Sequence, residues 1–302
     1  MLSVVSCERK QAIDFERIDT HSREDLASIS FFNSNEGLAV AGATWRKTDL
    51  LITRNGGESW SSDSIYNKKI FGLSRPVQNA MYGAGIDRFW KFGPDGTFEL
   101  SPPGEYRFYR SVDANDKGFC LAAGGEAFRI GYVDLWNGKD STKRVYEGVN
   151  ELDAVAWVKE DVFVAAGFGL AVRTKNLGQS WDTMDVSGDH YLDVYKVNNG
   201  PVYMLGAQGS VWKSNEEGEQ WQQMRKADVF ATRRHRALCF ADAQNGIIVG
   251  DDALLEVTRD GGEHWSSLNT IDENVDFSCC SYSQGYYFVG GQNGLMIKFK
   301  AP

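Results

Sequence analysis

The sequence predicts an all-β fold, a seven-bladed β-propeller whose blades are four-stranded antiparallel sheets. Three observations predict it. The 302 residues include 32 Gly and 13% aromatic residues but only 6 Pro, which suits many short strands joined by tight turns. An apolar run closed by a glycine recurs along the whole chain at nearly constant spacing. A polar turn that ends in a tryptophan follows in four of these units.

Seven closing glycines, 39 to 44 residues apart, mark the repeat. They are Gly42, Gly83, Gly124, Gly167, Gly206, Gly250 and Gly290. Units of this length with about four short strands each are typical of propeller blades. The strands expected in the first unit are residues 27–32, 37–43, 50–53 and 59–64. The units leave no room for a second domain, so we expect a leader and linker at residues 1–10 and a single propeller domain over residues 11–302.

The seventh unit is one strand short. After Gly291 it has only residues 295–300 before the chain ends at Pro302. Residues 13–18, ahead of the first unit, alternate apolar and polar side chains as a half-buried strand does. We therefore expect this N-terminal strand to complete the last blade as its outer strand and to close the ring.

The polar turn has a fixed spacing: Ser or Thr, a polar side chain two residues later, Gly four residues later and Trp seven residues later. The four copies are Thr53, Asn55, Gly57 and Trp60; Thr174, Asn176, Gly178 and Trp181; Ser214, Glu216, Gly218 and Trp221; and Thr258, Asp260, Gly262 and Trp265. The second side chain is expected to accept hydrogen bonds from amides of its own turn, and the glycine to supply a positive φ. The tryptophan is expected to fill the seam with the next sheet. Two further units keep the spacing with altered turns at residues 93–96 and 134–138.

These turns resemble the Asp-box, or BNR, repeat, in which the box is a structural turn on the outer part of each blade. Asn55, Asn176 and Glu216 replace the aspartate of that pattern, which keeps an acceptor but gives no support to a metal role. Residues 245–250 followed by 258–265 look like the photosystem II stability and assembly factor family. This resemblance implies a seven-bladed, non-catalytic assembly chaperone with an arginine-rich patch on the ring.

A basic loop stands out in a chain whose net charge is −9 and whose pI is near 5.1. That balance argues against a nucleic-acid binder, which neutralises phosphates with a basic surface. The candidate binding residues of this loop are Arg225, Lys226, Arg233, Arg234, His235 and Arg236. They predict a patch for an acidic partner; the alternative is a solvated loop paired with nearby acids. Trp45 and Trp90, next to basic residues, are the aromatic side chains we expect to be exposed at a binding face.

The cysteines bear on the location of the protein. Cys7 follows Val4-Val5-Ser6, which resembles a bacterial lipobox and predicts a lipidated protein of the cell envelope or periplasm. The alternatives are a secreted protein, or a cytoplasmic one if Met1 is the true start. Cys279 and Cys280 are expected to be buried thiols rather than a strained disulfide. The four histidines lie far apart, so neither a metal nor a cofactor is expected.

The expected function is therefore a non-catalytic scaffold that binds a protein partner or assembles a complex in the bacterial envelope, as a monomer. A membrane-associated protein is one option for this partner. The scaffold itself would be attached to a membrane only through a lipid on Cys7, since no apolar run is long enough to span a bilayer. The alternative is a carbohydrate-active propeller, either a divergent sialidase or glycosidase or a glycan-binding module. Residues 74–76 only partly match the R-I-P motif of sialidases, and no catalytic motif of another enzyme class is present.

Overall fold

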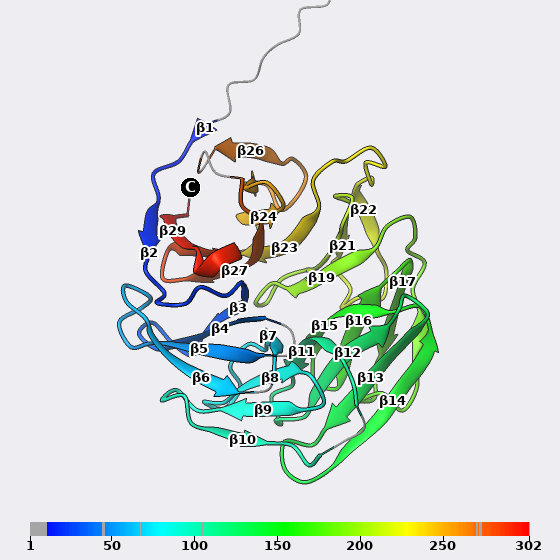
Figure 1. The fold of residues 1–302 in the computed structure, drawn as a ribbon. Helices are drawn as coiled ribbons and strands as arrows, with labels where there is room; N and C mark the ends of the chain where they lie inside the picture. Colours follow the sequence, from blue (N-terminus) through cyan, green and yellow to red (C-terminus); the bar gives the residue numbers. More distant parts are fainter. Residues whose placement is uncertain are drawn as a thin grey trace, which may run out of the picture.

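Seven antiparallel sheets surround a central axis in the computed structural model, which describes residues 11–43, 46–66, 68–103, 106–269, 271 and 274–301 (Figure 1). The first two blades contain β3 (Leu26–Phe31), β4 (Gly37–Ala43), β5 (Lys47–Thr53) and β6 (Ser61–Tyr66), then β7 (Ile70–Leu73), β8 (Met81–Gly85), β9 (Phe89–Phe92) and β10 (Phe98–Leu100). The third and fourth contain β11 (Tyr109–Ala114), β12 (Cys120–Glu126), β13 (Ile130–Trp136) and β14 (Thr142–Val149), then β15 (Leu152–Lys159), β16 (Val162–Gly167), β17 (Leu170–Thr174) and β18 (Asp182–Thr183).

The fifth and sixth blades contain β19 (Tyr191–Lys196), β20 (Val202–Gly206), β21 (Val211–Ser214) and β22 (Gln222–Arg225), then β23 (His235–Phe240), β24 (Gly246–Gly250), β25 (Leu254–Thr258) and β26 (Ser266–Asn269). The seventh contains β27 (Phe277–Ser283), β28 (Tyr286–Gly291), β29 (Met296–Lys300) and the N-terminal β2 (Glu16–Ile18). A short 3₁₀ turn, η1 (Gln292–Gly294), joins β28 to β29. The predicted seven-bladed propeller is thus confirmed, and in the first blade the expected second strand has the observed bounds.

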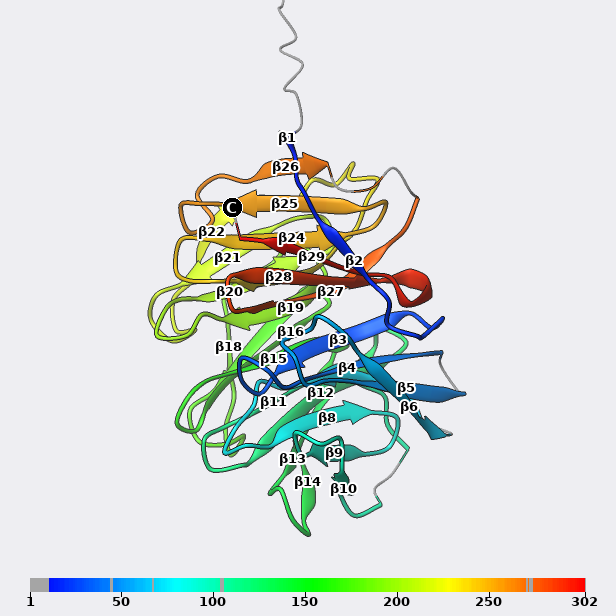
Figure 2. The same ribbon diagram turned by 90° about the vertical axis from the view of Figure 1, so that its left-hand side faces the viewer.

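The N-terminal segment closes the ring in two steps. β2 pairs antiparallel with β29, so it is the outer strand of the seventh blade, as expected from residues 13–18. Ile18 is buried in the seam with the first blade. In addition, β1 (Gln11–Ala12) pairs in parallel with β26 and extends the sixth blade, which the sequence pattern did not indicate. The first strands therefore tie the last two blades together, as Figure 2 shows from the side.

Because each blade has four antiparallel strands and begins at the centre, every inner strand runs in the same direction along the axis. We call the side where the inner strands β3, β7, β11, β15, β19, β23 and β27 begin the front face, and the side where they end the back face. The connections between blades and the hairpins between second and third strands lie on the front face. The polar turns, which join third to fourth strands, lie on the back face. The two faces therefore carry different loops.

The middle strands are buried on both sides because each blade packs between two others. Leu38, Ala39, Val40 and Ala41 of β4, for example, are all fully buried. Seven separate apolar clusters fill the seven seams between neighbouring blades. A strand that is buried on both faces has a continuous run of apolar residues instead of alternating apolar and polar ones. The repeat therefore appears in the sequence as an apolar run closed by a glycine.

The polar turns make the hydrogen bonds expected of them in three of four copies. In the first, the Gly57 amide donates to Thr53 Oγ1 (2.9 Å) and the Ser59 amide donates to Asn55 Oδ1 (3.0 Å). The same bonds recur in the turns of Thr174 and Thr258. In the third copy the Gly218 amide donates to Ser214 Oγ (3.0 Å), but within residues 214–221, all of them described, no amide donates to the carboxylate of Glu216. The expected acceptor is wrong there, because the extra methylene of glutamate carries the carboxylate past the turn.

The tryptophans of these turns fill seams, but with the preceding blade rather than the next one. Trp60 packs against Phe31 and the seam with the seventh blade, and Trp265 lies beside Phe240 in the seam with the fifth. Trp181 donates its indole N–H to the Val145 carbonyl of the third blade (2.9 Å). The turn precedes the outer strand of its blade, and its tryptophan packs on the side of that blade that faces the preceding blade of the ring.

Candidate binding surface around the central channel

A channel of about 740 Å³ runs along the axis and is lined by inner strands from all seven blades. Side chains of one inner strand bond the backbone of the next around this wall. Ser111 Oγ accepts from the Val155 amide (3.2 Å), Asp113 Oδ2 from the Trp157 amide (2.8 Å), and Asp193 Oδ2 from the Leu238 amide (2.9 Å). Each of these bonds links one blade to the next, so the channel wall is a rigid, polar ring.

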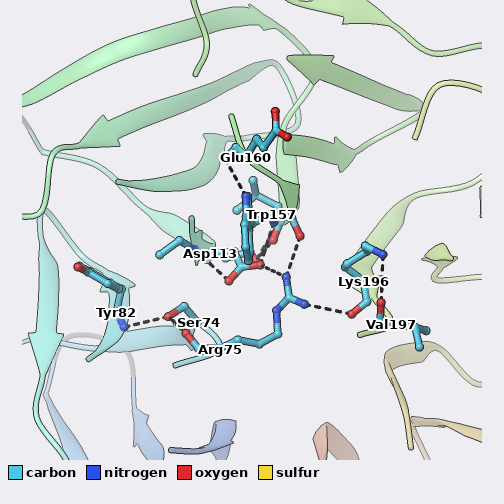
Figure 3. A network of polar contacts seen from close by, with 11 residues as sticks. Ser74, Arg75, Tyr82, Asp113, Trp157, Glu160, Lys196 and Val197 are labelled. Atoms are coloured by element: carbon cyan, nitrogen blue, oxygen red, sulfur yellow. Dashed lines mark hydrogen bonds and ion pairs between the residues drawn. The ribbon is translucent and has the colours of Figure 1, made fainter. Parts of the chain in front are cut away.

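Arg75 crosses the channel at the back face (Figure 3). It follows β7 in the second blade, and its guanidinium pairs with Asp113 of the third blade (3.0 Å) and donates to the Trp157 carbonyl of the fourth (2.7 Å). It also donates to the carbonyl of Lys196 in the fifth blade (3.2 Å). One side chain therefore bridges four blades, and burial together with this positive charge lowers the pKa of Lys196.

Asp193 is the unusual acid of the channel wall. Its carboxylate accepts one backbone hydrogen bond, from Leu238 (2.9 Å), and lies near the thiols of Cys279 and Cys280. Burial raises its pKa to about 7, because hydrogen bonding from the backbone does not compensate for the loss of water. Asp193 therefore differs from Asp113, whose carboxylate is paired with the guanidinium of Arg75.

The front face carries exposed aromatic side chains beside the channel. Phe128, in the hairpin between β12 and β13, and Phe168, in the hairpin between β16 and β17, are 56% and 47% exposed. Their rings are 5.7 Å apart, and both contact the imidazole of His190 at 5.9 and 5.5 Å. His190 Nε2 lies 2.6 Å from Asp153 Oδ2, which holds the ring in place. We call these three rings the aromatic triad.

Basic side chains lie beside other aromatic rings at the front mouth of the channel. The Arg110 guanidinium is 5.5 Å from the Phe71 ring and pairs with the largely buried Glu151 (3.3 Å). The Lys69 ammonium is 4.9 Å from the same Phe71 ring. Burial and the neighbouring Arg110 lower the pKa of Lys69. The front mouth thus combines apolar surface with positive charge held by aromatic faces.

The front face as a whole is the apolar side of the molecule. Of the ten exposed large hydrophobic side chains in the described residues, seven belong to its loops or strand ends. They are Tyr106, Phe128, Ile130, Val149, Phe168, Val229 and Phe230. Two of the other three, Phe98 and Leu100, lie on the outer strand β10, and Tyr286 begins β28 on the back face. The exposed apolar side chains of the described residues are therefore concentrated on one face of the ring.

The predicted basic loop is divided by the structure into two parts. Arg225 pairs with Glu256 (2.7 Å), and Arg236 pairs with Asp251 and approaches Asp276 (3.6 Å). His235 is buried, with its Nε2 3.6 Å from Glu256. Burial opposes ionisation of Glu256, but His235 and Arg225 outweigh it and lower the pKa of Glu256 to about 2. The two arginines are thus paired with neighbouring acids and the histidine is buried beside one, as in the alternative interpretation of the loop.

The other part of the loop faces solvent. Lys226 and Arg234 are exposed and Arg233 is partly exposed, and none of the three forms an ion pair within the described chain. Between them lie Val229 and Phe230, 68% and 86% exposed. These two apolar residues were not among the predicted binding residues of the loop, which were chosen by their charge alone. An apolar pair between turn-forming and basic residues was the signal that could have found them.

The two tryptophans predicted to be exposed have different outcomes. Trp90 is only 1% exposed, so that prediction is wrong. It lies on β9, a middle strand, and packs with Leu50 and Met81 in the seam between the first two blades. Trp45 and the candidate lipidation site Cys7 lie outside the described residues.

Cys120, Cys239 and Cys279 are buried free thiols and Cys280 is a partly exposed one, so the neighbouring Cys279 and Cys280 form no disulfide. No three histidine, cysteine or acidic side chains in the described ranges are placed to hold a metal ion together. In the same part of the chain, no helix has the length and apolar character needed to cross a membrane.

Comparison with known proteins shows that other β-propellers share this fold. No protein-family model and no curated sequence matches the chain. A structure of YCF48 bound to D1 peptide is 16% identical, covers 97% of this chain and 98% of its own, and has a TM-score of 0.72. YCF48 from Cyanidioschyzon merolae is 11% identical, with coverages of 95% and 98% and a TM-score of 0.70. The WD40 propeller domain of Doa1 is 10% identical, with coverages of 95% and 97% and a TM-score of 0.73. At these identities the similarity concerns the fold.

Proposed function

We propose that the protein is a non-catalytic scaffold that binds a protein partner with its front face. The observation that carries this proposal is the aromatic triad on the front face, two exposed phenylalanines held against a histidine that is anchored by Asp153 of the channel wall. Rigid aromatic side chains on a fixed scaffold lose little conformational entropy on binding, and they are the residues that dominate protein interfaces. The surrounding basic groups suit a partner segment with apolar side chains and carboxylates.

The comparisons support a protein partner in general terms. One structure of similar fold is described with a bound peptide, and another is a WD40 propeller. The polar turns support membership of the Asp-box repeat class, since three copies make the same hydrogen bonds. Together with the sequence resemblance, these points favour an assembly factor similar to those of photosystem II over a carbohydrate-active propeller.

The charge arrangement in the channel supports the absence of catalysis. Each of the three arginines that line it has a carboxylate of its own: Arg75 with Asp113, Arg110 with Glu151, and Arg236 with Asp251. A sialidase-like site instead gathers three arginines on one substrate carboxylate, so we expect no turnover on a panel of fluorogenic sialosides and glucosides. We also propose, from the lipobox-like residues at Cys7, that the scaffold works at the cell envelope.

The experiment is a capture of partners from native membrane extract with the tagged protein. The Phe128→Ser/Phe168→Ser variant is expected to recover the partner at about a tenth of the wild-type yield, because two central apolar contacts are lost. Phe98→Ser is the matched control, since Phe98 is similarly exposed but lies on the outer strand of the second blade. If the double variant recovered the same proteins in the same yield, the aromatic triad would not be the binding site for the partner.

A further inference from the structure

The loop between β22 and β23 ends in an apolar tip. The Ala231 amide donates to the Asp228 carbonyl (2.9 Å), which closes a β-turn with Val229 and Phe230 at its two central positions. The Phe230 amide donates to Asp228 Oδ1 (3.0 Å), so the aspartate is used inside the turn. The central residues of a turn project farthest from its base, which explains why Phe230 is 86% exposed. No other large hydrophobic side chain in the described residues is as exposed.

The tip is held on a fixed base. The Asp228 amide donates to the Gln208 carbonyl (2.9 Å) at the start of the tip, and the His235 amide donates to the Ala207 carbonyl (3.0 Å) at its end. Both acceptors belong to the hairpin between β20 and β21. The Arg225 and Glu256 pair lies directly below the loop. The tip is therefore presented in one conformation, and little entropy is lost when it is bound.

Positive charge flanks the apolar tip on both sides. Lys226 precedes it and Arg233 and Arg234 follow it, so residues 226–234 carry three positive charges and one negative charge, Asp228. This local charge of +2, from three minus one, contrasts with the net charge of −9 of the whole chain. Apolar and aromatic side chains flanked by lysine and arginine are the chemistry that binds the interface of an anionic bilayer.

We propose that this loop docks on an anionic lipid bilayer, with Val229 and Phe230 inserted at the headgroup level and Lys226, Arg233 and Arg234 against the lipid phosphates. The tip projects into solvent, with Phe230 86% exposed, so it suits a soft surface that it can enter. Phe128, Phe168 and Val149 belong to the same face, so docking would turn the aromatic triad toward the membrane surface. The loop would thus orient the front face toward partners at a membrane, independently of any lipid on Cys7.

The test is co-sedimentation of the full chain with vesicles of phosphatidylcholine alone or with about 30% phosphatidylglycerol, at low and high salt. The wild type is expected to bind the anionic vesicles at low salt, and to bind the neutral ones at least about tenfold more weakly. Phe230→Ser and Arg233→Glu/Arg234→Glu are each expected to lower the partition coefficient about tenfold.

The matched controls are Phe98→Ser and Lys139→Glu/Lys143→Glu, which remove an exposed phenylalanine or two exposed lysines elsewhere. They are expected to bind within about twofold of the wild type. Absence of binding to anionic vesicles, or equal binding by all variants, would overturn the proposal. The proposal would also be overturned if the wild type did not bind vesicles but self-associated on size exclusion, and Phe230→Ser abolished that self-association. The tip would then bind a second copy of the chain. Because the vesicles contain no protein, the result is separate from that of the partner capture.

Discussion

Single polar side chains inside the ring act across blades, and their environments differ sharply. Arg75 joins four blades through one carboxylate and two backbone carbonyls, and its charge is balanced by Asp113. Asp193 has no cation bonded to it among the described residues and accepts only from backbone amides. The first arrangement strengthens the ring near neutral pH, whereas the second favours a protonated carboxyl.

Asp193→Asn is expected to gain stability relative to the wild type as the pH rises from 5 to 8. The pKa of Asp193 is about 7 in the folded protein and near 3.8 in the unfolded chain, so the folded state holds the proton more tightly. The wild type therefore loses stability as the pH rises between these two values, by about 4 kcal/mol in total and about 2–3 kcal/mol between pH 5 and 8, whereas the amide does not titrate. Urea unfolding at a series of pH values measures the difference. A difference that does not change with pH would show that Asp193 ionises normally.

At the scale of the turn, the hydroxyl and the glycine amide are the essential pair. Thr53 is fully buried, and its Oγ1 accepts from the Gly57 amide and donates to Asn55. Glu216 in the third copy contributes only its backbone. The sequence spacing therefore identified the turn correctly. It could not show that asparagine and aspartate are short enough to accept from the turn amide whereas glutamate is not.

Thr53→Val is expected to lower the free energy of unfolding by about 1–3 kcal/mol, because it leaves the buried Gly57 amide without an acceptor. Glu216→Ala is the control and is expected to change it by less than about 0.5 kcal/mol. Both values come from denaturant unfolding of the full chain. If Thr53→Val were as stable as Glu216→Ala, the threonine hydroxyl would contribute little to the stability of its turn.

At the scale of the whole molecule, the glycine spacing was sufficient for the blade number and the alternation of residues 13–18 for the closing strand. The residues of the binding surface could not be predicted in the same way. The acids that pair with Arg225 and Arg236 belong to the sixth blade and the segment after it, 15 to 40 residues along the chain, so local charge counting could not find them. The aromatic triad combines three separate loops, which only the closed ring brings together.

Ring closure makes a prediction about Ile18, which is buried between the seventh and first blades. Ile18→Ala is expected to lower the free energy of unfolding by about 2–4 kcal/mol through the cavity it leaves in that seam. Glu16→Ala, on the same strand but exposed, is expected to change it by less than about 0.5 kcal/mol. Thermal unfolding of the two variants checks this. If Ile18→Ala were as stable as Glu16→Ala, β2 would contribute little to the closed ring.

The central claim is that the front face binds the partner, and site-specific photo-crosslinking tests it most directly. A photoreactive phenylalanine analogue is placed at Phe168 on the front face or at Tyr286 on the back face, two positions of similar exposure. Irradiation in native membrane extract is expected to give a defined crosslinked protein from position 168 and none from position 286. A specific adduct from position 286 alone would contradict the account.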